Sequence, residues 1–256
     1  MTVTNSTIKT QLNHRSIRSF TDEPVSEEIM ETLFDVARHA ASTVFFQMFS
    51  IIRIKDPELR ELIHQATGQA YVGGDKGELL IFVVDLHRNA QIREEAGVDN
   101  EPLSWASLAN FGFYDTLLAA QNLVVAAESL GLGTVYLGSI GGNREGIIEA
   151  LKLPKHTFPV FGLLLGYPAN VPPSKPRLPL EILVGTDAYP EVDNYHEALA
   201  EYDEQVRRYY DERTPDHPEP AFTTQIEKKI GAGGIQLEPL RARLQAQGLA
   251  LRDCER

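Results

Sequence analysis

Hydrophobic positions recur along the chain with helical or strand-like spacing and divide most of it into alternating elements. A helix is predicted over 26–39, because apolar side chains return every three or four positions, at Ile29, Leu33, Phe34 and Ala37. Ser26 is a suitable N-cap for it. Residues 57–66 resemble a short surface helix. The longest candidate helix spans 103–130, and its apolar residues cover most of the circumference, which is typical of a helix inside the molecule. Gly131 is a suitable stop.

Four short runs rich in β-branched and aromatic residues predict strands, at 50–54, 79–86, 133–138 and 158–168. The run at 79–86 is apolar enough for a central strand. A loop and a helix ended by Pro154 are expected between the last two runs. Strands that alternate with helices around one dominant helix indicate an α+β or α/β fold.

Beyond Pro168 the pattern changes to a proline-stiffened connection without periodicity. A polar amphipathic helix is expected over 193–213, a proline-bearing break over 214–220, and a last helix over 237–247. We therefore predict a single domain over 1–256, in which 169–256 forms a C-terminal extension.

Composition narrows the class of protein. The 24 basic and 36 acidic residues give a net charge of −12, which opposes binding to nucleic acid or to anionic membranes. The one cysteine, Cys254, can form no internal disulfide and no cysteine-based metal cage. No signal-peptide core and no run of ~18 apolar residues occurs, so a soluble cytoplasmic protein is expected.

Two basic clusters offer candidate phosphate ligands. His14, Arg15, Ser16 and Arg18 place four donors suited to a phosphate within five residues, although a solvated basic patch is the alternative. Lys175 and Arg177 lie in a loop stiffened by prolines, which presents two cations at low ordering cost. Taken alone, such a loop is more often ordinary surface.

A glycine-rich turn, GSIGGN at 138–143, follows a predicted strand and lets backbone N–H groups approach an anion or a flat ring. This turn does not match the common glycine-rich motifs of nucleotide-binding proteins and hydrolases. A dinucleotide fold that uses Gly131 and Gly133 would need glycine where Tyr136 stands, and neither a P-loop nor a GxSxG motif occurs. The histidines show no HExxH spacing, so no metal site is expected.

Together, the segments HRSIRSFTDEPVS, SIIRI, AAQNLVVAAESLGLGTVYLGSIGGN, LKLPKHTFPVFGLLLGYPAN and KPRLP occur in an order that resembles the nitroreductase superfamily, in particular its nitroreductase A and NADPH-flavin reductase subgroup. The resemblance runs from about residue 13 to about residue 213. It implies an α+β fold with a central, mostly antiparallel sheet, and a homodimer with FMN at its interface.

The resemblance also implies residue roles. His14, Arg15, Ser16 and Arg18 are expected to hold the FMN phosphate and ribityl chain, with Lys175 and Arg177 closing on the other side. Expected at the flavin are Ser42, Gln69, Tyr136, Gly138 and Ser139, where relatives often have a second glycine in place of Ser139.

Arg213 matches an arginine that contacts the NADPH 2′-phosphate in the subgroup, with Arg207, Arg208 and a plain solvated cation as alternatives. The segment 214–222 resembles a mobile flap. Tyr71, Phe45 and Phe46 are candidates for stacking on an aromatic acceptor, although a core role is favoured for the two phenylalanines.

The resemblance predicts ping-pong two-electron transfer from NADPH through FMN to small acceptors such as a nitroaromatic, a quinone or free flavin. Hydride transfer needs no side-chain nucleophile or general acid, so none is assigned. Two alternatives stay open: a reductase that supplies free reduced flavin to a partner monooxygenase, and a flavin-binding redox sensor without turnover.

Overall fold

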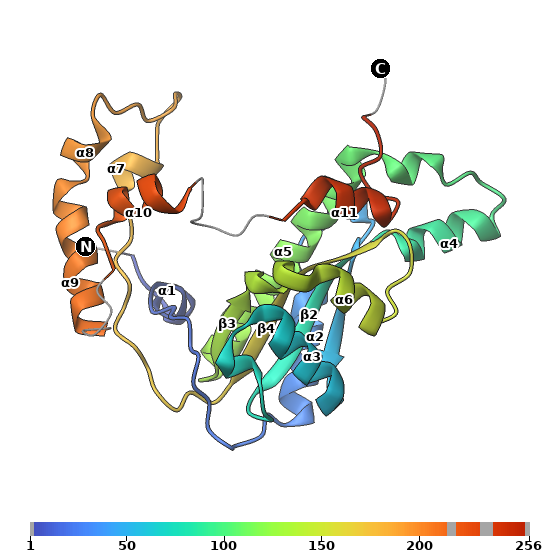
Figure 1. Ribbon diagram of the computed structural model, residues 1–256, viewed down its shortest axis with the longest axis horizontal. Helices are drawn as coiled ribbons and strands as arrows, with labels where there is room; N and C mark the ends of the chain where they lie inside the picture. Colours follow the sequence, from blue (N-terminus) through green and yellow to red (C-terminus); the bar gives the residue numbers. More distant parts are fainter. Residues whose placement is uncertain (1–2, 214–218, 231–237, 254–256) are drawn as a thin grey trace. The chain divides into compact units, whose positions relative to one another are not determined.

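The computed structural model describes residues 3–213, 219–230 and 238–253 (Figure 1). The chain forms two units: unit 1 comprises 1–171 and 238–256, and unit 2 comprises 172–237. The boundary at 171 lies two residues after the position where the sequence predicts the C-terminal extension to begin.

A four-stranded antiparallel sheet lies at the centre of unit 1, in the order β1-β2-β4-β3. Its strands are β1 (Phe49–Ile54), β2 (Glu78–Asp85), β3 (Gly133–Leu137) and β4 (Thr157–Gly166). All four lie where the hydrophobic runs predict them. The two most apolar strands, β2 and β4, occupy the interior of the sheet, and β1 and β3 form its edges.

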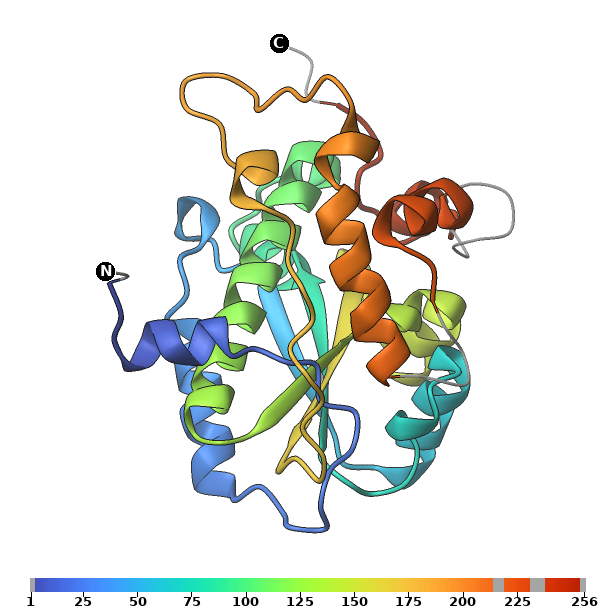
Figure 2. The same ribbon diagram turned by 90° about the vertical axis from the view of Figure 1, so that its left-hand side faces the viewer.

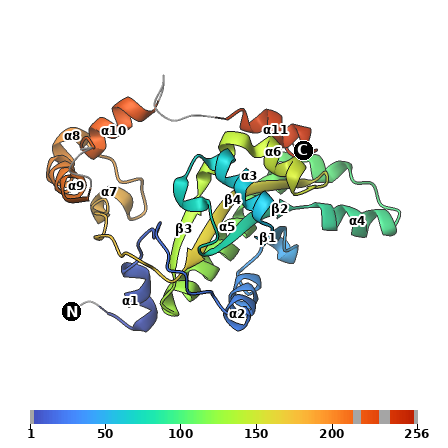
Figure 3. The same ribbon diagram turned by 60° about the horizontal axis from the view of Figure 1, so that its bottom comes forward.

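Helices cover both faces of this sheet. Side chains alternate along a strand, so Leu80 and Phe82 of β2 point to one face and Leu79, Ile81 and Val83 to the other. The first face packs against α2 (Glu27–Arg38) and α5 (Ala106–Ser129), and the second against α3 (Pro57–Thr67) and α6 (Arg144–Ala150). Figure 3 shows α3 and α6 on one side of the sheet and α2 on the other.

The long helix α5 runs along the sheet, as Figure 2 shows, and confirms the predicted central helix. It begins after Trp105, because the residues before it form a 3-10 turn. It ends where Gly131 takes a left-handed conformation, φ +82°. Its buried residues recur every three or four positions and form one face, which packs on the sheet, whereas Tyr114, Leu117 and Leu118 are about half exposed (53%, 49% and 49%).

Further short elements complete unit 1. The helices are α1 (Ser6–Leu12), α4 (His87–Glu95) and α11 (Leu240–Ala246), and the 3-10 turns are η1 (Thr43–Phe45), η2 (Ala70–Val72), η3 (Glu101–Ser104) and η4 (Gly138–Asn143). The pattern did not predict α1 or α4, both of which lack an apolar face. α6 ends at Ala150, four residues before the predicted stop at Pro154, because Lys152 takes a left-handed conformation. Leu244 and Leu249 of the C-terminal segment pack with Met48, Val84 and Phe158.

The described residues of unit 2 form four helices, α7 (Leu180–Leu183), α8 (Tyr195–Ala198), α9 (Ala200–Arg213) and α10 (Phe222–Lys229). The predicted helix over 193–213 is divided at Leu199, which is buried with Tyr202 and Val206 in a small core. Residues 214–218 of the expected flap lie outside the described residues. No helix among the described residues combines the length and hydropathy needed to cross a membrane.

Candidate functional site

The HRSIR segment lies along the outer edge of β3. Ser16 forms a parallel bridge with Thr134, and the Ile17 N–H donates to the Thr134 carbonyl at 2.8 Å. Gly133 permits this close approach, because a Cβ there would lie 2.5 Å from Cγ1 of Ile17. The motif is therefore fixed by backbone contacts to the strand that leads into the glycine-rich turn.

His14 is held by a carboxylate of α5. Its Nδ1 lies 2.7 Å from Oε1 of Glu128, and the Thr134 hydroxyl donates to the same oxygen at 2.9 Å. A ring nitrogen that faces a carboxylate carries the proton, so only Nε2 of His14 is left for a ligand. The imidazole is thus oriented before any ligand arrives.

The two arginines of the motif have no carboxylate partner within the described ranges. Arg15 donates to the carbonyl of Asn13 at 2.7 Å, while its buried Nε has no hydrogen-bond partner there. A cavity of about 310 Å³ lies beside it and is also lined by Lys9. Arg18 is exposed, with its guanidinium 5.9 Å from the ring centre of Tyr71. Both charges are available to an anion.

The segment around Gln69 approaches the same place from α3. Gln69 precedes the 3-10 turn that contains Tyr71, the residue under Arg18. A Cβ on Gly142 would lie 2.8 Å from the Ala66 carbonyl, so the end of α3 and the glycine-rich turn are in close contact. Three segments distant in the sequence therefore lie together along β3 and the turn that follows it.

The glycine-rich turn begins directly after β3. The Tyr136 hydroxyl donates to Oε1 of Gln121 at 3.2 Å, and its ring packs edge-on against Phe161 at 5.1 Å. Burial raises the pKa of the Tyr136 phenol above its ordinary value. A Cβ on Gly138 would meet no atom within 4 Å, so this backbone has an open face, beside the half-buried Ser139.

Within one chain, Ser42 does not lie near the residues of HRSIR, Gln69 and the glycine-rich turn. It precedes Thr43, whose N–H donates to Asp115 of α5 at 2.7 Å, whereas His14 contacts Glu128 of the same helix. Asp115 and Glu128 are thirteen residues apart on α5, roughly 20 Å at a rise of about 1.5 Å per residue. Among the predicted flavin contacts of unit 1, Ser42 stands apart.

The predicted cations of unit 2 lie beside α9. The Lys175 Nζ is 5.4 Å from the ring centre of Tyr210, and Arg177 donates to the Lys175 carbonyl at 3.2 Å. The Tyr202 hydroxyl donates to the Pro176 carbonyl at 3.4 Å, which links the proline-stiffened loop to the helix. Neither cation has a carboxylate partner among the residues described.

Arg213 ends α9 and is held by an aromatic side chain. Its guanidinium donates to the Tyr209 hydroxyl at 2.9 Å. Arg207 is paired with Glu204 at 2.7 Å. Arg208 is exposed and lines a shallow hollow of about 450 Å³ that Glu212 also lines. Among the described residues neither Arg208 nor Arg213 forms an ion pair, and Arg213 is held by the Tyr209 hydroxyl.

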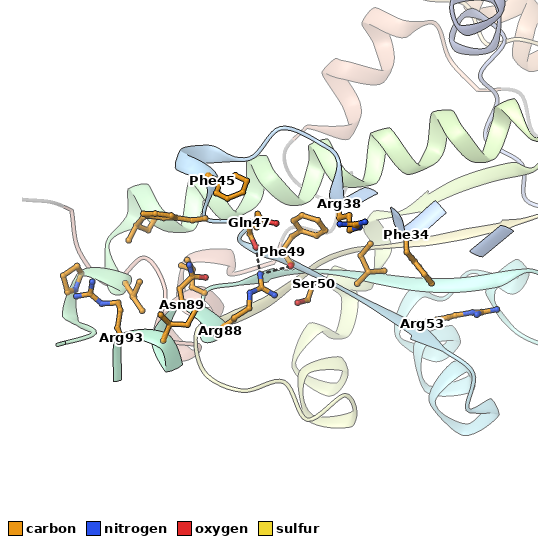
Figure 4. A pocket seen from close by; sticks show the side chains of 17 residues that line it. Phe34, Arg38, Phe45, Gln47, Phe49, Ser50, Arg53, Arg88, Asn89 and Arg93 are labelled. Atoms are coloured by element: carbon orange, nitrogen blue, oxygen red, sulfur yellow. Dashed lines mark hydrogen bonds between the residues drawn. The ribbon is translucent and has the colours of Figure 1, made fainter. Parts of the chain in front are cut away.

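A separate pocket of about 960 Å³ lies beside the edge strand β1 (Figure 4). Its walls come from α2, the 45–51 region, α4, η3 and the start of α5, and no predicted flavin contact lines it. The sequence did not indicate this pocket, because segments this distant meet only in the fold. Phe45 and Phe46 line it and are 80% and 52% exposed, so the core role favoured for them is wrong.

Among the described residues no group of three or more His, Cys, Asp or Glu side chains could hold a metal ion.

Two family models match the parts of the chain that contain these motifs. Residues 12–167 match the Nitroreductase family, and residues 175–252 match the Nitroreductase family, C-terminal domain. An oxygen-insensitive NADPH nitroreductase of Salmonella typhimurium is 45% identical over 80% of this chain and 82% of its own length. An FMN reductase (NADPH) of Bacillus subtilis is 40% identical over 87% of this chain and 90% of its own length.

Solved structures show the same fold. The NfrA1 nitroreductase from B. subtilis superposes with a TM-score of 0.89 and 35% identity, covering 96% of this chain and 100% of that one. The NADPH:FMN oxidoreductase from Vibrio harveyi, complexed with NAD+, gives 0.86 and 33%, covering 97% and 100%. The known architecture includes the edge strand beside HRSIR, the glycine-rich turn and the long central helix. The chain is a member of the nitroreductase family.

Proposed function

We propose that the protein is an FMN-dependent oxidoreductase that takes electrons from NADPH and passes them to small acceptors. The observation that carries the proposal is that three segments lie together along β3 and the turn after it, with Arg15 and Arg18 free of carboxylate partners among the described residues in a chain of net charge −12. When bound, FMN supplies the two-electron chemistry, accepting a hydride from NADPH and delivering it to a nitroaromatic, a quinone or free flavin.

The residues present fit this cofactor in two respects. The buried Nε of Arg15 lacks a hydrogen-bond partner among the described residues, and such a donor is satisfied when a phosphate oxygen approaches. The open face of Gly138 leaves room for a flat ring against the backbone, where any larger residue would project a side chain.

Each predicted residue then has a defined task. The phosphate and ribityl chain are held by His14 through Nε2 and by Arg15, Ser16, Arg18, Lys175 and Arg177. Gln69 and the turn at Gly138 and Ser139 orient the ring, with Tyr136 contributing its backbone because its side chain faces Phe161. Backbone N–H groups of this turn would stabilise negative charge on the ring.

We further propose a homodimer in which Ser42 reaches the flavin of the second copy. Its separation from His14 along α5 supports this arrangement, because one chain holds the two residues at distant points of the helix. Exposed apolar side chains nearby also favour a symmetric interface: they are Val44, Phe45, Phe46, Tyr114, Leu117 and Leu118.

Reduction of free FMN is a second candidate activity, favoured by the name of the Bacillus subtilis relative, an FMN reductase (NADPH). A reductase of this kind releases reduced flavin, which a coupled flavin-dependent monooxygenase assay would detect. A redox sensor without turnover would consume no NADPH at steady state.

The experiment is a visible spectrum of the purified protein, repeated without oxygen after one equivalent of NADPH or of NADH. We expect a bound-flavin spectrum that NADPH bleaches faster than NADH does. A colourless protein that takes up no added FMN would overturn the proposal, because the phosphate contacts of HRSIR and of the 175–177 loop would then have no ligand.

A further inference from the structure

Asp115 is a fully buried carboxylate in the middle of α5. Both of its oxygens accept backbone N–H groups of one loop: Oδ1 from Thr43 at 2.7 Å and Oδ2 from Met48 at 2.9 Å. A carboxylate is costly to bury unless its oxygens are hydrogen-bonded. Asp115 accepts from the first and the last residue of the loop 43–48 and therefore fixes both of its ends to α5.

The loop 43–48 has an unfavourable backbone. Val44, Phe45 and Gln47 all take left-handed conformations, with φ of 48°, 61° and 50°. Residues other than glycine rarely adopt the left-handed region, and a β-branched residue such as valine does so least readily. Such a conformation persists only when the surroundings hold it, and it gathers at functional sites.

The loop also displays apolar side chains to solvent. Phe45 is 80% and Val44 62% exposed, while Met48 is fully buried and anchors the far end. Figure 4 shows Phe45 on this loop beside the pocket. Apart from Met48, the apolar side chains of this strained loop face outward and gain little from core packing, so the shape of the loop serves a contact with another molecule.

We propose that Asp115 is a positioning residue that holds this strained loop in the shape that brings Ser42 to the flavin. The inference rests on the proposed function. It explains why the residue is an aspartate: two N–H donors need two acceptors. An asparagine would turn an NH₂ group towards one of the loop's N–H groups.

The test compares Asp115→Asn with Thr116→Val in the full-length chain. Thr116 is the matched control, because it is also fully buried on α5 but its hydroxyl donates to Gly112 of the same helix at 2.7 Å. We expect Asp115→Asn to raise the FMN dissociation constant at least tenfold and to speed amide exchange at Thr43 and Met48. We expect Thr116→Val to lower Tm about as much as Asp115→Asn does. It should leave the FMN dissociation constant and the amide exchange at Thr43 and Met48 unchanged.

A double mutant shows whether Asp115 acts through Ser42. If it does, adding Ser42→Ala to Asp115→Asn leaves the FMN dissociation constant unchanged, although Ser42→Ala weakens binding on its own. Additive effects of the two substitutions would overturn the inference.

A second variant keeps the aspartate itself, in case Asp115→Asn does not fold. Thr43→Pro removes the N–H that donates to Oδ1, at the first position of a 3-10 turn, where proline is tolerated. Weaker FMN binding at a loss of Tm no larger than that of Thr116→Val supports the inference. Normal FMN binding by this variant overturns it, whereas a wild-type protein without FMN affinity overturns the proposed function itself.

Discussion

At the scale of single residues, the pairing of each cation decides which one can receive a phosphate. Arg38, Arg53, Arg88 and Arg144 all contact carboxylates. Arg207 is paired with Glu204 in the same way, whereas among the described residues Arg213 contacts the hydroxyl and ring of Tyr209. An arginine held on an aromatic ring keeps donors free for a second ligand.

We therefore predict that Arg213→Ala raises the Michaelis constant for NADPH about tenfold and changes that for NADH less than twofold, since one lost charge-assisted contact costs roughly 1.5 kcal/mol. Steady-state kinetics with both nucleotides measure this. Arg207→Ala serves as the control, and it should alter neither constant. Equal effects of Arg213→Ala on the two nucleotides would remove the assigned role.

How far the sequence predicted the site also differs by residue. The HRSIR and glycine-turn residues could be proposed as candidates because short segments of sequence carry them together. The sequence did not show that Glu128 occupies Nδ1 of His14, since 114 positions separate the two. Phe45 and Phe46 were misjudged, because hydrophobicity alone predicts burial and the left-handed backbone of their loop was not visible in the pattern.

At the scale of elements, a buried ion network fixes the glycine-rich turn to the C-terminal segment. Glu238 accepts from Arg144 at 2.9 and 2.5 Å and from Arg243 at 2.7 Å. Arg243 also donates to the Gly141 carbonyl at 2.8 Å. The Gly141 Cα lies so near this carboxylate that a Cβ would be 2.9 Å from Oε1. The segment before α11 thereby holds η4 in place.

This network makes stability depend on pH. The Arg144 guanidinium, helped by Arg243, lowers the pKa of Glu238 below its ordinary value of 4.5. A carboxyl whose pKa is lower in the folded state stabilises the protein above its unfolded pKa, and this contribution disappears as the pH falls through the folded value.

Glu238→Gln should accordingly lower Tm by several degrees at a pH of about 7, with the difference from wild type shrinking as the pH drops below about 4. Thermal unfolding followed by circular dichroism across this range measures it. Glu149→Gln on the exposed side of α6 is the control, with no such dependence expected. A deficit that stays constant down to a pH of about 3 would contradict the assignment.

The elements themselves were predicted where the hydrophobic period is strong. All four strands, α2 and α5 follow that period, and Ser26 caps α2 through the Ile29 N–H as expected. α4 and α10 were missed. α4 is polar with one buried residue, Ala90, and α10 buries none, so neither shows a clear pattern. The division at Leu199 reflects burial of that side chain in the core of unit 2.

At the scale of the whole molecule, the exposed stripe on α5 bears on assembly. Tyr114, Leu117 and Leu118 repeat at helical spacing and each keep about half of their surface exposed. Such an exposed apolar stripe on a helix whose buried face packs on the sheet is typical of a surface that a second copy covers. The dimer and the completion of the flavin site by Ser42 are thus one proposal.

Size-exclusion chromatography with light scattering should give a mass near twice 28.5 kDa. Leu118→Glu should shift the protein to monomer and weaken FMN binding at least tenfold, because a charge in an apolar interface is desolvated without a partner. Val98→Glu, on the loop after α4, is the control and should remain dimeric. A monomer of wild type with tightly bound flavin would defeat the dimer proposal.

The packing of the C-terminal segment on unit 1 also has a consequence for biosynthesis. Leu244 and Leu249 fill a core cluster with Met48, Val84 and Phe158, yet the ribosome makes them only after all of unit 2. While unit 2 is being translated, that apolar cluster lacks its last two members. Residues 1–171 therefore have an incomplete core until synthesis ends. We expect chaperones that bind exposed apolar surface to bind this segment during translation.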